Sequence, residues 1–182
     1  MGSLSMEYSR EREVQIRLGK VCPYCRSDTK YASSSAEVYN GKDFGPIFIC
    51  RPCRAWVGSH KDRQEPMGMV CKSDDKLSRV ITHAYFDTLW QPASKYQIFK
   101  SRAAAYEAFA REMKLSPKLA HIGCLTIPEC IKLQTVCKRL LKEKMPSKYE
   151  DYLLYVDFKI DKRHDARDVS SVIRAINRPK RR

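Results

Sequence analysis

Four of the eight cysteines stand in two identical pairs, each with two residues between its members. Thiolates at this spacing lie on one tight loop and point at the same ion, and two such loops complete the tetrahedral four-sulfur shell that suits Zn²⁺. Such a shell has no open position, so the ion stabilises the fold and takes no part in catalysis. The sequence therefore predicts one structural Zn²⁺ whose ligands are Cys22, Cys25, Cys50 and Cys53.

Cationic and aromatic residues surround these four predicted ligands. Arg26, Arg51 and Arg54 flank them, and we expect their charges to lower the pKa of the thiols. Cations mixed with aromatic rings also suit nucleic acid, because the cations neutralise phosphates and the rings stack on unpaired bases. The alternative is that the aromatic side chains cover the thin core of a small module. The candidate nucleic-acid contacts in this region are Lys42, Arg51, Arg54 and Trp56.

A second basic surface is predicted on a helix that follows the capping box Thr126-Ile-Pro-Glu129 and runs to about Lys144. A basic helix face can neutralise phosphates, and side chains at the helix start can reach bases. The alternative is the ordinary solvated face of an amphipathic helix. The candidate contacts, which share one side of this helix, are Lys132, Arg139 and Lys142. A basic tail at 177–182 would add an electrostatic arm.

Three further residues are candidates for catalysis. His83 and Asp87 stand four residues apart on a predicted helix and could reach one ion. Together with His60 they would form a cluster of two nitrogens and one carboxylate, as a metal-dependent nuclease uses. The alternative is that His83 hydrogen-bonds within a packed junction while Asp87 meets a neighbouring arginine.

The remaining thiols also have two interpretations. His121, Cys124, Cys130 and Cys137 could form a second zinc site. However, Cys130 and Cys137 lie seven residues apart on the apolar side of a predicted helix, where free cysteine behaves as a small hydrophobic residue.

Short strands and turns must position the paired cysteines. Residues 36–39 are predicted as a strand end, 40–41 as a turn, and 46–50 and 54–57 as strands. This order of loop, hairpin, loop and strand is typical of a zinc ribbon, with a treble clef as the alternative.

From Ser73 onward the hydrophobic pattern becomes helical. A capping box at 94–97 predicts the start of the next helix, and Ser116-Pro117 predicts a short turn. Residues 148–161 fit a helix or a strand, and 165–176 fit a helix.

The predicted fold class is thus α+β, a small β zinc ribbon followed by a mainly helical module. The predicted segments are an N-terminal extension (1–20), the zinc ribbon (21–72), the helical module (73–145), a helix or strand appendage (146–176) and the basic tail (177–182).

The composition points to a polyanionic partner. Lys and Arg number 35 against 21 Asp and Glu, a net charge of +14. A hydrophobic content of 43% excludes wholesale disorder, and no apolar run reaches the length of a membrane span or follows the start as a signal peptide would. We therefore expect a soluble cytoplasmic protein with reduced cysteines and no membrane partner.

Several motifs together resemble a known family. They are Cys22-Pro-Tyr-Cys25, Tyr39-x-Gly41-x₃-Gly45, Ile49-Cys-Arg-Pro-Cys53, Gly58-x-His60, Pro66-x-Gly68, His83-Ala-x-Phe86-Asp87-x-Leu89-Trp90, Ala105-Tyr106 and His121-Ile-Gly123. In this order they resemble zinc-finger-containing domains of bacteriophages and bacteria, over roughly residues 20–140. The resemblance implies a ribbon plus helices, a phage or prophage setting and the cytoplasm of a bacterial host, and it supplies no activity.

The leading hypothesis from these observations is a non-enzymatic zinc protein that binds single- or double-stranded DNA, mainly through phosphates. Its role would be in replication, transcription control or host takeover. One alternative is an adaptor or inhibitor that binds a host protein. A second is a metal-dependent nuclease that uses His60, His83 and Asp87.

Overall fold

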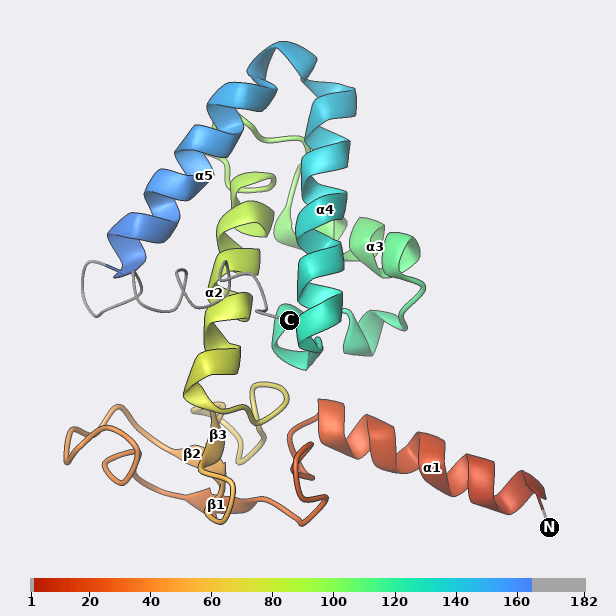
Figure 1. Cartoon of the computed structure of the whole chain (residues 1–182), viewed down its shortest axis with the longest axis vertical. Helices are drawn as coiled ribbons and strands as arrows, with labels where there is room; N and C mark the ends of the chain where they lie inside the picture. The colour runs from red at the N-terminus through yellow and green to blue at the C-terminus, as the bar shows by residue number, and fades with distance from the viewer. Residues whose placement is uncertain (1, 165–182) are drawn as a thin grey trace, which may run out of the picture.

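The computed structural model describes residues 2–164, so the helix predicted at 165–176 and the basic tail at 177–182 lie outside the described residues. A small sheet lies at one end of the molecule and α2 leads from it into a group of helices (Figure 1). In chain order the elements are α1 (Gly2–Arg17), β1 (Lys30–Ala32), β2 (Ile47–Cys50), β3 (Ala55–Gly58), α2 (Ser73–Thr88), α3 (Arg102–Met113), the 3₁₀ turns η1 (Pro117–Leu119) and η2 (Ile122–Cys124), α4 (Ile127–Lys144), the 3₁₀ turn η3 (Pro146–Lys148) and α5 (Tyr149–His164). None of the helices within residues 2–164 is long and apolar enough to cross a membrane.

The sheet is antiparallel, in the order β1-β2-β3, and Phe48 at its centre pairs with Tyr31 on one side and Val57 on the other. The strands predicted at 46–50 and 54–57 are therefore confirmed. The prediction of a strand end at 36–39 is wrong, because this segment forms consecutive turns. The loop that contains this segment is closed by Asp43, whose carboxylate accepts hydrogen bonds from the N–H groups of Ser35 (3.0 Å) and Gly45 (2.8 Å). Such local bonds compete with a sheet ladder, and here they prevail.

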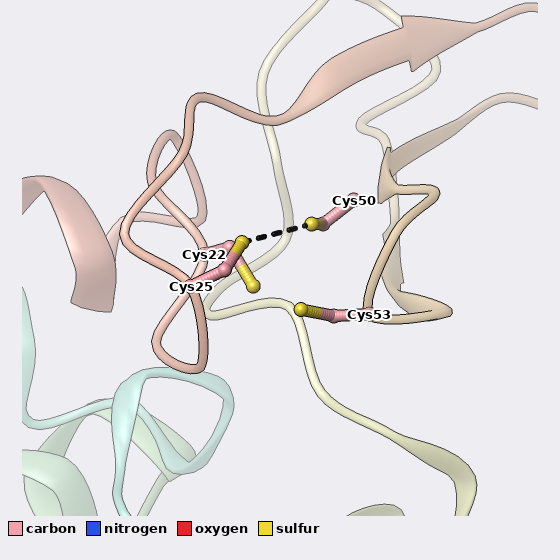
Figure 2. A group of neighbouring side chains, drawn as sticks. All are labelled: Cys22, Cys25, Cys50 and Cys53. Carbon is pink, nitrogen blue, oxygen red and sulfur yellow. Dashed lines mark hydrogen bonds between the residues drawn. The ribbon is translucent and has the colours of Figure 1, made fainter.

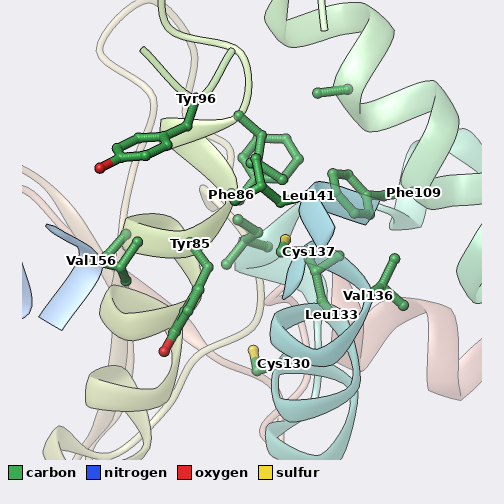
Figure 3. Close-up of a cluster of buried hydrophobic side chains, with 14 of the residues drawn as sticks. Tyr85, Phe86, Tyr96, Phe109, Cys130, Leu133, Val136, Cys137, Leu141 and Val156 are labelled. Atoms are coloured by element: carbon green, nitrogen blue, oxygen red, sulfur yellow. The ribbon is translucent and has the colours of Figure 1, made fainter. Parts of the chain in front are cut away.

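Helix α2 lies between α4 and α5, and these helices together with α3 enclose the helical core (Figures 1 and 3). Phe86 of α2 packs against Phe109 of α3, with ring centroids 5.2 Å apart. Leu133 and Leu141 of α4 are completely or almost completely buried in the same cluster. The amphipathic pattern read from residue 73 onward thus marks the residues that form this core.

Two predicted helix starts have different outcomes. At Thr126 the capping box is present: the Thr126 N–H donates to the Glu129 carboxylate at 2.9 Å. At 94–97 no helix begins, and α3 starts instead at Arg102, after Ser101 whose hydroxyl accepts from the Ala104 N–H. The reason is tertiary, because the chain folds back on the end of α2 and two backbone N–H groups, at residues 98 and 99, donate to the Leu89 carbonyl.

The segment 148–161, which the sequence left open between helix and strand, lies in α5 apart from its first residue. Tyr152, Val156 and Ile160 recur at four-residue intervals and join the helical core. The Tyr152 hydroxyl donates to the Tyr85 carbonyl at 3.1 Å. A boundary between 145 and 146 stays a prediction, although buried side chains on both sides of it share one core.

Candidate metal centre and adjoining cleft

The two cysteine loops share a left-handed residue directly after the second cysteine, although the hydrogen bonds that close them differ. In the first, the Arg26 N–H donates to the Cys22 carbonyl at 3.0 Å, and Arg26 has a φ of 63°. In the second, the Arg54 N–H donates to the Arg51 carbonyl at 3.1 Å, and Arg54 has a φ of 51°. The residue after each second cysteine therefore adopts the left-handed conformation, which turns the chain tightly enough for both thiols of a pair to face one point.

The four thiols gather where the loops meet (Figure 2). All four sulfur atoms lie within 4.8 Å of one another, and Cys25 and Cys50 are 3.5 Å apart. A tetrahedron with Zn–S bonds of 2.3 Å requires sulfur separations of about 3.8 Å. Cys22 and Cys50 are buried, Cys53 is half-buried and Cys25 is exposed. The arrangement fits one Zn²⁺, with Cys25 on the solvent side.

The environments of the thiols differ across the site. Backbone and side-chain hydrogen bonds from Ser27 lower the pKa of Cys25 to about 6. Burial raises the pKa of Cys50 to about 12. Two of the three flanking arginines, which the sequence predicted to lower these pKa values, are engaged elsewhere: Arg26 pairs with Glu13 and Arg51 with Glu37. The pKa of the exposed thiol is lowered by hydrogen bonds, not by these charges.

The candidate nucleic-acid contacts near the site fall into two groups. Lys42 and Arg54 are exposed and form no ion pair with a described residue. Arg51 forms two hydrogen bonds with the Glu37 carboxylate, both 2.9 Å long. Trp56 is half-buried, because it packs edge-on against Tyr39 and the Lys76 amine lies over its ring. Lys42 and Arg54 are therefore the more available pair.

The basic face of α4 is divided in the same way. Lys132 and Lys142 are exposed, and the Lys142 amine lies 5.4 Å from the centroid of the Tyr149 ring. Arg139 forms ion pairs with Glu112 at 2.6 Å and with Glu143 at 2.9 Å. The two carboxylates neutralise most of the charge that Arg139 adds to this face.

Neither additional metal cluster is assembled in the part of the chain that the structure describes. There, the four paired cysteines are the one group of three or more potential ligands with mutually adjacent ligand atoms. His83 Nδ1 lies 3.4 Å from the Asp87 carboxylate, which also accepts from the Trp90 indole at 3.0 Å. His60 does not complete a ligand set with them. The residues of the second predicted zinc site form no such group in the described chain either. Cys124, Cys130 and Cys137 are buried, and the His121 ring packs on Tyr106.

The histidines have another relationship that the sequence did not reveal. His60, His83 and His121 line one cleft of about 850 Å³, together with Arg102 and Tyr106 of α3. The last two residues were not among the predicted site residues. The sequence does not show that these five residues line one cleft, because they come from four separate segments of the chain.

A close backbone contact forms one wall of this cleft. Gly68 has a φ of +138°, and a Cβ atom there would lie 2.4 Å from the Gly123 carbonyl oxygen. The Met69 N–H donates to the same carbonyl at 2.9 Å. The zinc module (residues 21–72) is thereby joined to the turn before α4. Nearby, Arg17 of α1 donates two hydrogen bonds to Glu129, at 2.8 and 3.0 Å.

A family model described as a zinc-finger-containing domain matches residues 19–140. No curated protein and no solved structure matches the chain. The matched range includes both cysteine pairs and all the histidines of the cleft. The resemblance read from the sequence motifs is confirmed, whereas the distribution among phages and bacteria stays a prediction.

Proposed function

Because this chain belongs to the family of the zinc-finger-containing domain and holds a closed four-cysteine zinc site, we propose that it is a non-enzymatic protein that binds DNA. The zinc ion shapes the module that carries one contact surface, and α4 carries the other. A phage or prophage origin, a place in the bacterial cytoplasm, and a role in replication, transcription control or host takeover belong to the same proposal.

The observation that carries this proposal is the excess of 14 positive charges together with exposed cations that pair with no carboxylate in residues 2–164. Lys42 and Arg54 near the zinc site and Lys132 on α4 are exposed and form no ion pair with a described residue. Unpaired cations on two surfaces release counterions from a phosphate backbone when they bind it, so affinity should fall steeply with salt.

The test is the affinity for short fluorescent single- and double-stranded DNA, measured by anisotropy over a salt series without a chelator. We expect the logarithm of the affinity to fall linearly with the logarithm of the salt concentration. Lys132→Ala should reduce the slope by about one, because it removes one phosphate contact. The matched control is Arg139→Ala on the same helix face, and its effect should be smaller because Glu112 and Glu143 already neutralise that charge. Absence of binding at low salt would refute the proposal.

A second candidate function is binding to a host protein. Ile127 and Ile131 lie one turn apart on α4 and are 41% and 56% exposed. Adjacent exposed apolar side chains are typical of protein contact sites. Salt-resistant capture of one partner, combined with weak DNA binding, would favour this function over the first.

A further inference from the structure

The cleft beside the zinc module has the size of a small-molecule site. Its volume of about 850 Å³ lies within the range of roughly 300–1,000 Å³ that ligand pockets occupy. The zinc module contributes His60 and the loop that follows it, α2 contributes His83, and α3 and the turns after it supply the opposite wall. The cleft is separate from the zinc site and contains none of its four ligands.

The charge inside the cleft is positive. Arg63 and Glu65 line it as an ion pair of 2.9 Å and largely cancel each other. Arg102 and Lys118 also line it, and neither forms an ion pair with a described carboxylate. A guanidinium and an ammonium that line one cleft suit a doubly charged anion, since arginine offers a planar fork and lysine a mobile point charge.

The histidines add hydrogen-bond donors. The Nδ1 atom of His83 faces Asp87, so this carboxylate holds the Nδ1 proton and orients the ring. The Nε2 atom of His83 donates to a ligand oxygen when the ring carries its second proton, a form that a bound phosphate favours. His60 lines the cleft from the zinc module. Imidazole groups on two walls can donate to different oxygens of one bound anion.

The rim of the cleft has aromatic surface as well. The His121 ring packs on Tyr106 with centroids 4.5 Å apart and an interplanar angle of 50°. The Arg102 guanidinium lies 5.5 Å from the centroid of the same Tyr106 ring. Burial, helped by the charge of Arg102, lowers the pKa of His121, which favours the neutral ring. A neutral, partly open ring beside two cations is a surface on which a nucleobase can stack.

We propose that this cleft binds a phosphate monoester attached to a nucleoside, either a free mononucleotide or the 5′-phosphorylated end of a nucleic-acid strand. Arg102 and Lys118 neutralise the phosphate, His60 and His83 donate to its oxygens, and His121 with Tyr106 supports the base. The site is independent of the proposed function, because it would bind a free nucleotide even if the outer surfaces bound no DNA.

The experiment uses the full zinc-loaded chain and two probes. The first is a 3′-fluorescein single strand with either a 5′-phosphate or a 5′-hydroxyl, followed by anisotropy. The second is adenosine 5′-monophosphate, with adenosine as its control, followed by calorimetry. We expect each phosphorylated probe that binds in the cleft to bind about tenfold more tightly than its control, the effect of one charge-assisted contact.

Single variants locate the site. Arg102→Gln and Lys118→Gln should abolish the preference for phosphate, and both residues are exposed enough for the fold to persist. The matched control is Lys100→Gln, which removes an exposed lysine outside the cleft and should leave the preference unchanged. Circular dichroism of each variant verifies that the helices are intact.

The results separate the two sources of the phosphate. Binding of adenosine monophosphate identifies a free nucleotide as a ligand, and a preference for the 5′-phosphate strand without such binding identifies a strand end. Failure of DNA binding refutes only the proposed function, because calorimetry still measures the nucleotide. The inference is overturned if neither probe is distinguished from its control, or if the preference survives in both Arg102→Gln and Lys118→Gln.

Discussion

The zinc module and the helical core are stabilised in different ways. Around the four cysteines the buried cluster contains Cys22, Cys50, Ala55 and Val70, so two of its four buried members are themselves ligands. The helical core buries eighteen side chains of the described residues, among them five aromatic rings and leucines from three segments. A region with so little apolar burial needs another source of stability, and a tetrahedral metal site supplies it.

Removing the zinc should have the largest effect of any single change. In small zinc domains the metal contributes an apparent free energy of about 10–16 kcal/mol, which the thin cluster around Cys22 cannot replace. We expect a chelator, or Cys22→Ser, to unfold the zinc module while α2 to α5 keep their helical signal. Far-UV circular dichroism and limited proteolysis measure the two parts separately.

The control for this experiment is Cys137→Ala, which removes a thiol of the helical core. It should retain one zinc ion per chain in a colorimetric zinc assay. If chelation instead melts the helices together with the sheet, the two regions are one cooperative unit and the comparison fails.

Phe109→Ala should have the next largest effect, on the opposite region. Phe109 is almost completely buried and packs against Phe86 and Phe99. Truncating such a ring typically lowers the free energy of unfolding by about 3–5 kcal/mol. Urea denaturation followed by circular dichroism measures this loss. The zinc content of the native variant should stay at one, and loss of zinc would contradict the independence of the regions.

The Arg17–Glu129 ion pair tests an indirect link between the regions, because α1 also contacts the zinc module through Glu13 and Arg26. Arg17→Ala should lower the free energy of unfolding by about 2 kcal/mol, because it removes charge-assisted hydrogen bonds to a half-buried carboxylate. Glu129→Gln is the matched variant, since glutamine can keep the capping box at Thr126 while the charge is lost. If urea denaturation gives similar losses of unfolding free energy in the two variants, the effect belongs to the ion pair. A loss in Arg17→Ala alone would contradict this assignment.

The same pair has a defined pH dependence. Burial alone would raise the pKa of Glu129, but hydrogen bonds from Arg17 and Thr126 outweigh it and hold the pKa below the ordinary value of 4.5. A carboxyl group with a lowered folded pKa stabilises the protein above the unfolded pKa, and the contribution disappears as the pH falls through the folded pKa. The stability difference between the wild type and Glu129→Gln should therefore be full at neutral pH and shrink in acid.

Tyr152→Phe should have the smallest effect. It removes one hydrogen bond to the Tyr85 carbonyl and leaves the packing of the ring, so we expect a loss of about 1 kcal/mol in urea denaturation. A loss as large as that of Phe109→Ala would show that polar contacts, and not apolar burial, dominate the helical core.

The success of the sequence predictions depended on how local each feature is. The cysteine pairs and the capping box at Thr126 each act over four residues, and both were read correctly. The capping box predicted at 94–97 failed because the decisive contact is with Leu89, the residue that follows α2. Local patterns contain no information about such a partner.

The cleft could not have been predicted for the same reason. His60, His83 and His121 stand far apart in the sequence, and no spacing rule joins them. The sequence singled out the first two for a nuclease site and His121 for a second zinc site, and the structure places all three instead on the walls of one cleft, which Arg102 and Tyr106 also line. The predicted DNA contacts stay predictions, since their test is a binding measurement.

The bond between Arg17 and Glu129 also bears on how the chain folds as it is made. The two residues are 112 positions apart, whereas 24 residues separate the cysteine pairs. At ribosomal rates of 5–20 residues per second, Arg17 emerges about 6–22 s before Glu129. The zinc module can therefore close around its ion while α4 is still to be synthesised. During that interval α1 can already contact the zinc module through Glu13 and Arg26, whereas its bond to α4 belongs to the last stage of folding.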